Sequence, residues 1–317
     1  MSKNDQSEKK RNISQVSDRD VSVEAGPYHS PVTVIGLGPM GQALVGALLK
    51  NGHSTTVWNR TAEKANPLVS QGAILANSVA DAVAASPLVI ICVLDYNIVH
   101  SVLGPVGDAL KGRTLVNLTA DSPKHAREMA TWAAQYGIDY LDGAIMTPTP
   151  TIGTPAASVL YSGPESVFKT HQATLASLGG TASYLGEDPG RAAAYDVALL
   201  DLFWTSMSGY AHALALATAE NIPAKEFAVY AQGIIAIMPD IMTYLANEVD
   251  AGYYPGDKSN IISASAGMEH IIHASQHHGL DVSVLSAAMA VTQQAINEGY
   301  ATDGFSRLTE LLRKPSA

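Results

Sequence analysis

A glycine pattern near the start of the chain constrains its fold more than any other feature. Gly36, Gly38 and Gly41 have the spacing G-x-G-x-x-G, directly after the β-branched run 32–35 and before a helical pattern over 40–51. Such glycines allow a tight turn, close approach of the backbone to a pyrophosphate, and close helix–strand packing. The amides and dipole at the helix start favour phosphate. The pattern predicts a dinucleotide-binding Rossmann domain. Its predicted loop contacts are Gly36, Leu37, Gly38, Pro39, Met40 and Gly41.

Strand and helix patterns alternate through the first half of the chain, which predicts a mainly parallel, doubly wound α/β sheet. Short runs typical of strands lie at 54–58, 89–93, 114–118, 140–143 and 158–161. Helical patterns alone follow residue 190, at 190–219, 224–250, 260–278, 283–297 and 305–313. We therefore predict a flexible extension over 1–30, a dinucleotide-binding domain over 31–189, an inter-domain helix over 190–219 and a helical domain over 220–317.

Charge and composition narrow the possible partners. A formal net charge of −10 over 317 residues argues against nucleic acid or an anionic membrane surface as a partner. No uninterrupted apolar run approaches the roughly 18–20 residues of a membrane span, and the N-terminus lacks the apolar core of a secretory signal. We expect a cytoplasmic protein. The single cysteine, Cys92, excludes an internal disulfide, and its apolar surroundings predict a buried strand residue.

The residues after the second strand select the cofactor. NADH sites usually place an acidic residue there, to accept hydrogen bonds from the ribose hydroxyls. This chain has Asn59, Arg60 and Thr61 instead, with Lys64 one turn further on. A guanidinium can bind a 2′-phosphate through two hydrogen bonds, and the neighbouring polar groups can add others. We predict NADPH as the cofactor; the alternative is a solvated loop that is basic by coincidence.

Several segments together resemble the imine reductases, a group within the β-hydroxyacid dehydrogenase superfamily. They are the glycine loop and the stretches 57–61, 117–119 and 190–200. The resemblance covers nearly all of the chain from residue 32 onward. It implies a Rossmann domain, a long inter-domain helix, and an all-α domain that interlocks with a second subunit in a homodimer. Further predicted cofactor contacts, at strand ends and in the resembling segments, are Val93, Leu94, Asn117 and Thr119.

The chain departs from the hydroxyacid dehydrogenases at the positions that handle a hydroxy acid. Those enzymes carry a catalytic lysine near the start of the inter-domain helix, whereas this chain has no lysine between Lys169 and Lys225. Their Ser-Gly-Gly turn for the substrate carboxylate is replaced by a stretch in which Met146 has no hydroxyl and Pro148 has no amide hydrogen. These changes favour an apolar substrate that can carry a positive charge.

Two acids, Asp196 and Asp201, lie on the otherwise apolar long helix. They are about 140° apart around the helix axis, so one pocket is unsuited to use both. Position alone does not choose between them. The resemblance implies that Asp196 is catalytic, because it matches the acid of imine reductases; the alternative is a solvent-facing carboxylate. The predicted reaction is hydride transfer from NADPH to a C=N bond, in which Asp196 holds the iminium and relays a proton.

Relatives that condense a ketone with an amine often have an asparagine where this chain has Ala120, and a tyrosine where it has Trp204. These differences favour preformed, cyclic imines over reductive amination. The resemblance implies a substrate pocket that partly comes from the second subunit, although methionines at helical spacing also suit a plain core. Its predicted lining is Ala120, Met146, Phe203, Trp204, Met207, Ile234, Met238 and Met242.

Other readings remain open. His270, His273 and His277 share one helix face, but without an H-E-x-x-H pattern we interpret them as a polar face and predict no metal. Asp95, after a strand, either contacts the ribose or caps the next helix. Two alternative functions are a hydroxyacid dehydrogenase with a displaced proton donor and a non-catalytic NADPH-binding protein.

Overall fold

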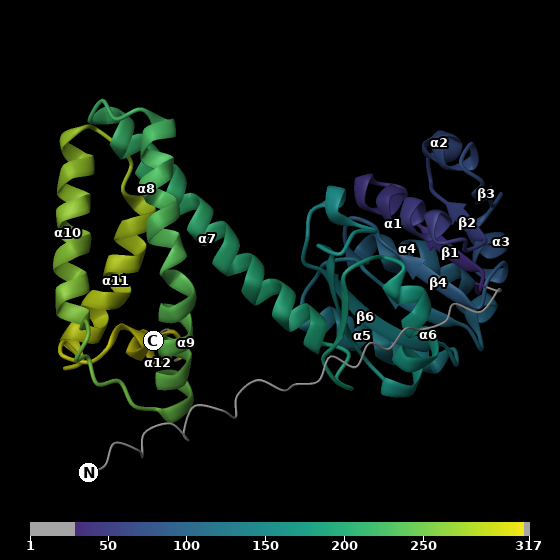
Figure 1. The fold of residues 1–317 in the computed structure, drawn as a ribbon. Helices are drawn as coiled ribbons and strands as arrows, with labels where there is room; N and C mark the ends of the chain where they lie inside the picture. Colours follow the sequence, from purple (N-terminus) through teal and green to yellow (C-terminus); the bar gives the residue numbers. More distant parts are fainter. Residues whose placement is uncertain (1–28, 314–317) are drawn as a thin grey trace, which may run out of the picture. The chain divides into compact units, whose positions relative to one another are not determined.

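The computed structural model describes residues 29–313 (Figure 1). The predicted extension over 1–30 lies almost entirely outside this range. Residue contacts divide the chain into two compact units that meet between Val197 and Ala198. Helix α7 (Arg191–Ala219) begins in the first unit and continues into the second. The predicted α/β fold with an all-helical C-terminal part is confirmed.

The first unit is built on one eight-stranded sheet, with the strand order β3-β2-β1-β4-β5-β6-β7-β8. All neighbouring strands are parallel except β6 and β7. The bounds are β1 (Val32–Ile35), β2 (Thr55–Trp58), β3 (Ile74–Leu75), β4 (Leu88–Ile91), β5 (Thr114–Asn117), β6 (Asp139–Ile145), β7 (Ser158–Ser162) and β8 (Thr181–Tyr184). The five later strand predictions are confirmed to within a few residues, as is the first. The sequence missed β3 and β8, the two edge strands of the sheet: β3 has only two residues, both exposed, and β8 contains the small residues Ala182 and Ser183.

Helices cover both faces of this sheet, so its strands are buried on both sides and consist of continuous apolar runs. Val34 of β1 packs with one helical layer and the adjacent Ile35 with the other. The first layer contains α1 (Pro39–Lys50), α2 (Asn66–Val69) and α6 (Glu165–Ala176). The second contains α3 (Val79–Ala84), α4 (Tyr96–Leu103) and α5 (Pro123–Gln135). This arrangement is the predicted doubly wound fold, with 3₁₀ turns at Ala62–Ala65, Gly104–Leu110 and Thr149–Thr151.

Local chemistry sets the ends of these elements. Gly52, with φ of +80°, ends the turn after α1, where a side chain would be strained. Asp95 caps α4 by accepting a hydrogen bond from the amide of Ile98 at 2.9 Å, so the capping alternative holds for this residue. Cys92 lies one position beyond β4 and is half-buried. Burial raises the pKa of its thiol to about 11, which keeps it protonated and unreactive.

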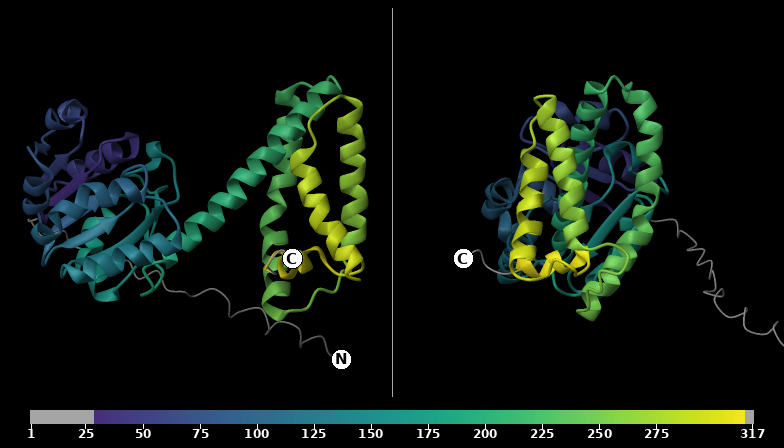
Figure 2. Two further views of the ribbon diagram at one scale, coloured as in Figure 1. Left: turned by 180° about the vertical axis from the view of Figure 1, so that it is seen from behind. Right: turned by 90° about the vertical axis from the view of Figure 1, so that its left-hand side faces the viewer.

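The second unit is helical throughout its described residues. After α7 come α8 (Ala224–Ala236), α9 (Met238–Ala251), α10 (Ile261–His277), α11 (Ser283–Asn297), a 3₁₀ turn (Phe305–Arg307) and α12 (Leu308–Arg313). The sequence predicted one helix over 224–250, which is wrong. The helix breaks at Ile237 because Pro239 has no amide hydrogen to donate and suits the first turn of a new helix. Figure 2 shows α10 and α11 side by side in both views, and they share a small core around Ile261 and Ala295.

Much of the apolar surface of the second unit is uncovered in the single chain. No residue of α8 is buried, and Ile234 is 64% exposed. The stretch Ala224–Ala251 is long and apolar enough, by length and composition alone, to cross a membrane. The test for an uninterrupted apolar run missed it because Asp240 and other polar residues interrupt the stretch. Core helices of proteins outside membranes also meet this criterion of length and composition. The feature that needs explaining is therefore the apolar surface that the single chain leaves exposed.

Candidate active site

The glycine loop after β1 has the geometry that a dinucleotide needs. Gly36 has φ of +99°, and a Cβ there would lie 2.1 Å from the backbone oxygen of Cys92. A Cβ on Gly41 would lie 1.9 Å from the oxygen of Gly36. At Gly38, by contrast, a Cβ would meet nothing within 4 Å. Gly36 and Gly41 thus hold the backbone together, while Gly38 leaves one side of the loop open for a pyrophosphate.

The loop is also tied to the end of β2. The amide of Leu37 donates to Oδ1 of Asn59 at 2.9 Å, and Nδ2 of Asn59 donates to the carbonyl of Thr61 at 2.9 Å. Asn59 therefore connects the glycine loop to the loop after β2, a structural role that the sequence did not suggest. Arg60, Thr61 and Lys64 are exposed beside it. The chain thus has one accessible guanidinium and one accessible ammonium at the position where a 2′-phosphate would bind.

The loops after β4 and β5 meet at the same edge of the sheet, because the carboxyl ends of parallel strands lie together. The amide of Val93 donates to Oγ1 of Thr119 at 3.2 Å, and the amide of Thr119 donates to Oδ1 of Asn117 at 3.0 Å. Leu94, in contrast, is 81% exposed. Since Cys92 also packs on Gly36, these predicted cofactor residues and the glycine loop form one contiguous edge. Ala120 follows Thr119 at this edge and is exposed.

Asp196 lies in the first two turns of α7 and is only 5% exposed. The solvent-facing alternative is therefore wrong for this residue. Burial raises the pKa of its carboxyl group. Among the described residues no cation and no hydrogen-bond donor compensates this carboxylate. Asp201, five residues later, is exposed, and Oγ1 of Thr205 donates to it at 3.4 Å.

A second buried acid, Asp142 on β6, was missed as a functional residue at the sequence level. It is 2% exposed, and its Oδ1 accepts hydrogen bonds from the hydroxyls of Tyr96 at 2.6 Å and Tyr140 at 3.0 Å. The amide of Ala193, in the first turn of α7, also donates to it. Burial, and to a smaller extent the nearby charge of Asp196, raise the pKa of Asp142 to about 7, against the effect of these hydrogen bonds. An acid in the middle of a buried strand was the available signal.

The other predicted pocket residues are distributed over both units. Met146 follows β6 and is half-buried in the first unit. The aromatic pair Phe203 and Trp204 lies on the second-unit part of α7, with ring centroids 5.1 Å apart, and both rings are exposed. Met207 of α7, Ile234 of α8 and Met242 of α9 are likewise exposed, while Met238 is half-buried. Their role in substrate binding stays a prediction.

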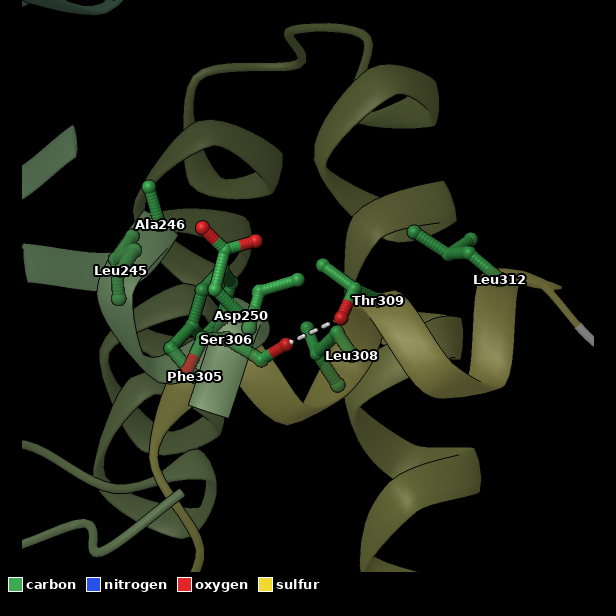
Figure 3. A pocket seen from close by; sticks show the side chains of 9 residues that line it. Leu245, Ala246, Asp250, Phe305, Ser306, Leu308, Thr309 and Leu312 are labelled. Carbon is green, nitrogen blue, oxygen red and sulfur yellow. Dashed lines mark hydrogen bonds between the residues drawn. The ribbon is translucent and has the colours of Figure 1, made fainter. Parts of the chain in front are cut away.

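The second unit has a separate apolar cavity of about 450 Å³ between α9 and the C-terminal turns (Figure 3). Its walls include Leu245, Phe305 and Leu312, and Oγ1 of Thr309 donates to the carbonyl of Ser306 at 2.9 Å. None of the predicted site residues lines it. It offers no cluster of groups for chemistry.

The histidines of α10 lie near few other side chains that could bind a metal in the described part of the chain. The ring of His278, just after the helix, pairs with Glu220 at 2.7 Å. Within residues 29–313, no group of three or more His, Cys, Asp or Glu side chains is placed to hold a metal ion.

Comparison with known proteins identifies the family. Residues 188–314 match the C-terminal domain of NADPH-dependent reductive aminase-like proteins, and residues 31–186 match the NAD-binding domain of 6-phosphogluconate dehydrogenase. The chain is 35% identical to an NADPH-dependent reductive aminase from Aspergillus oryzae, over 89% of this chain and 97% of the relative. The chain belongs to the imine reductase and reductive aminase family.

Solved structures of this family superimpose closely on the chain. An imine reductase from Myxococcus stipitatus in complex with NADP+ is 38% identical, with a TM-score of 0.85, over 89% of this chain and 100% of that one. A reductive aminase from Aspergillus terreus in complex with NADPH4, cyclohexanone and allyl amine is 37% identical, with a TM-score of 0.84, over 90% and 100%. The family membership predicted from the glycine loop and the start of the long helix is confirmed.

Proposed function

We propose that this member of the imine reductase family reduces the C=N bond of imines to amines with NADPH, and that Asp196 holds the reacting nitrogen. The observation that carries the proposal is the burial of this carboxyl group without a compensating cation among the described residues. A carboxyl group held away from most of the solvent is more stable in its charged form when a cation pairs with it. A protonated imine is such a cation, and it is also the reactive form of the substrate.

The residues around the glycine loop fit NADPH. The open side at Gly38 admits a pyrophosphate, and α1 begins without a side-chain cap, so its first amides remain available. Arg60 and Lys64 supply the positive charge for the 2′-phosphate. When bound, NADPH supplies the hydride. The similarity to relatives described as NADPH-dependent supports the same cofactor here.

Asp196 then acts on the substrate nitrogen. Its carboxyl group gives a proton to a neutral imine, or pairs with an imine that is already protonated, and the carbon becomes the better electrophile. Because α7 carries no lysine, the alternative reaction of a hydroxyacid dehydrogenase lacks the group that takes the alcohol proton in those enzymes. An imine carbon with two different substituents yields a chiral amine.

We favour preformed cyclic imines as substrates because Ala120 and Trp204 replace the polar side chains expected for condensation of a ketone with an amine. A relative from Aspergillus terreus is described in complex with dibenz[c,e]azepine and NADPH4, which is consistent with a cyclic substrate. Because some relatives are described as reductive aminases, condensation of a ketone with an amine followed by reduction is the second candidate reaction.

A homodimer would bury the apolar surface of the second unit that is exposed in the single chain. Many large apolar side chains of α7, α8 and α9 are exposed in the single chain, beyond what a monomer commonly shows. Among them are Phe203, Trp204, Val229, Tyr230, Ile234 and Ile235. An interlocked partner, as the family resemblance implies, would bury them and could add residues to the substrate pocket. A cytoplasmic location stays a prediction from the sequence.

The test is turnover of a panel of cyclic imines, such as 1-pyrroline and 3,4-dihydroisoquinoline, followed by NADPH absorbance. We expect Asp196→Ala to lower turnover at least about tenfold while NADPH affinity stays unchanged. Asp201→Ala, on the same helix but exposed, serves as the matched control and should retain activity. Unaltered turnover in the Asp196 variant would remove it from the mechanism. NADPH binding without turnover of any imine would instead favour a non-catalytic protein.

A further inference from the structure

The first turn of α7 is attached to the rest of the first unit by side chains from other elements. The first amides of a helix have no partner within the helix and need one elsewhere. The carboxylate of Asp188 accepts a hydrogen bond from the amide of Gly190 at 3.0 Å. The hydroxyl of Ser162, at the end of β7, accepts from the amide of Ala192 at 2.9 Å and donates to the carbonyl of Pro189 at 3.0 Å. Because Ser162 is fully buried, this end of α7 is fixed to the sheet.

A salt bridge attaches the same turn to α5. Nε of Arg127 donates to Oδ1 of Asp188 at 2.9 Å, and Nη2 donates to Oδ2 at 2.7 Å. A guanidinium that binds both oxygens of a carboxylate fixes the direction of the contact as well as its distance. The Arg127 guanidinium holds the pKa of Asp188 below its usual range, so the pair stays charged at neutral pH. Asp188 therefore joins α5, through Arg127, to α7, through Gly190.

Gly190 allows the two helices to approach closely. A Cβ there would lie 2.7 Å from Cζ of Arg127 and 2.8 Å from the carbonyl oxygen of Pro123, the first residue of α5. A side chain at this position would push α5 and α7 apart. The chain enters α5 only three residues after Ala120, which lies at the cofactor edge. The contact between the helices thus connects α7 to the loop that forms this edge.

The direction in which α7 leaves this contact decides where Asp196 lies. Asp196 is six residues beyond Gly190, which is about 9 Å along the helix axis. A rotation of α7 by about 10° about its first turn would therefore move Asp196 by about 1.6 Å. A misplacement of about 1 Å in an active site can lower the reaction rate about 100-fold. A small change at the start of α7 is enough to impair the reaction.

We propose that Arg127 is a positioning residue for imine reduction, whose two hydrogen bonds to Asp188 set the direction of α7 and thereby the place of Asp196 at the cofactor edge. This inference rests on the proposed function. Arg127 acts through Asp188 and not on the substrate. The two side chains are 51% and 46% exposed, so the pair contributes little to the stability of the fold. Its loss should change the geometry of α7 more than the stability of the protein.

The decisive variant is Arg127→Lys, which keeps the positive charge but cannot bind both carboxylate oxygens in the same way. We expect kcat for 1-pyrroline, counted per NADPH-binding site, to fall about tenfold. The NADPH dissociation constant should stay unchanged, and Tm should stay within about 2 °C of the wild type. Losses of kcat and of NADPH-binding sites in equal proportion would indicate a purely structural role and would overturn the proposal, as would an unchanged kcat.

Lys124→Ala is the matched control. Lys124 lies on the same helix and pairs with Glu128 at 3.7 Å, so its ion pair stays within α5 and does not reach α7. Both side chains are at least half exposed. This variant should therefore keep the kcat of the wild type. A loss equal to that of Arg127→Lys would show that any charge removed from α5 has the same effect, which contradicts the assignment.

Asp188→Asn tests the other half of the contact. Asparagine keeps an oxygen for the amide of Gly190 but loses the charge and one acceptor for the guanidinium. If Arg127 acts only through Asp188, the double variant should lose no more kcat than the single variants do. Additive losses would contradict the proposal. Asp188→Asn also keeps the proposal testable if the lysine variant fails to fold.

Hydrogen exchange separates this inference from the proposed reaction. Without substrate, the amides of residues 190–196 should exchange faster in Arg127→Lys than in the wild type, and at the wild-type rate in Lys124→Ala. Unchanged exchange in Arg127→Lys would overturn the positioning role even if the wild type reduces imines. If the wild type reduces no imine, the proposed reaction fails, and the exchange rates still decide whether Arg127 holds the start of α7.

Discussion

Alanine substitutions at two glycines of the loop, Gly36 and Gly38, should change two different properties: the first lowers protein stability and the second lowers cofactor affinity. Gly36→Ala should destabilise the protein before any cofactor binds. The new Cβ would lie 2.1 Å from the Cys92 oxygen, on backbone that cannot rotate away, and φ of +99° adds strain. Overpacking costs about 1–3 kcal/mol and an unfavourable left-handed backbone about 1–2 kcal/mol, so we expect a loss of about 2–5 kcal/mol. That should lower Tm by at least about 4 °C.

Gly38→Ala should leave stability nearly unchanged and weaken NADPH binding. Its φ of −67° is allowed for alanine, and the new methyl group meets no protein atom within 4 Å. The methyl group would instead occupy the space in which the backbone approaches the pyrophosphate. We expect a rise in the NADPH dissociation constant of about tenfold or more, equal to about 1.4 kcal/mol.

The assays are thermal unfolding of the cofactor-free protein and fluorescence titration with NADPH. Gly46→Ala is the matched control, because Gly46 lies inside α1 with free space around it. Alanine in a helix interior should raise stability by about 0.5–1 kcal/mol without changing NADPH affinity. Wild-type NADPH affinity in Gly38→Ala would refute the loop assignment. Wild-type stability in Gly36→Ala would refute the packing argument.

Three further predictions follow from single residues. Arg60→Ala should weaken NADPH binding about 10- to 100-fold, which corresponds to the loss of one charge-assisted hydrogen-bonded contact, and should leave NADH binding unchanged. Equal losses of affinity for both cofactors would contradict a contact with the 2′-phosphate. Ile234→Asp should convert a dimer into a monomer in size-exclusion chromatography with light scattering, because it places a charge on the exposed apolar face of α8; a monomeric wild type would refute the dimer. Burial lowers the pKa of His53 below 6.5, so the unfolded chain binds a proton more readily than the folded chain, and stability should fall as pH falls below about 6.5. The Tm of His53→Gln should therefore decrease less on acidification than the Tm of the wild type. An identical decrease would exclude His53 as the cause.

The sequence anticipated the fold well wherever the pattern was local. The strand at 32–35, the glycine spacing and the alternation of strands with helices follow from steric and hydrophobic rules that act over a few residues. The same holds for α11, whose predicted bounds agree with the structure. The prediction missed the break between α8 and α9, although Pro239 is itself a local signal for it, and it also missed the edge strands.

For the site, the sequence alone predicted the cofactor loop, the basic residues after β2, and, through a resemblance to a family, Asp196 as the catalytic acid. Only the tertiary structure decided that Asp196 is buried and that Asp142, which is 54 positions earlier in the chain, shares its surroundings. The physical reason is that proton affinity depends on desolvation and on neighbouring charges. Those neighbours come from α4, β5, β6 and α7, which meet only when the sheet and its helices assemble.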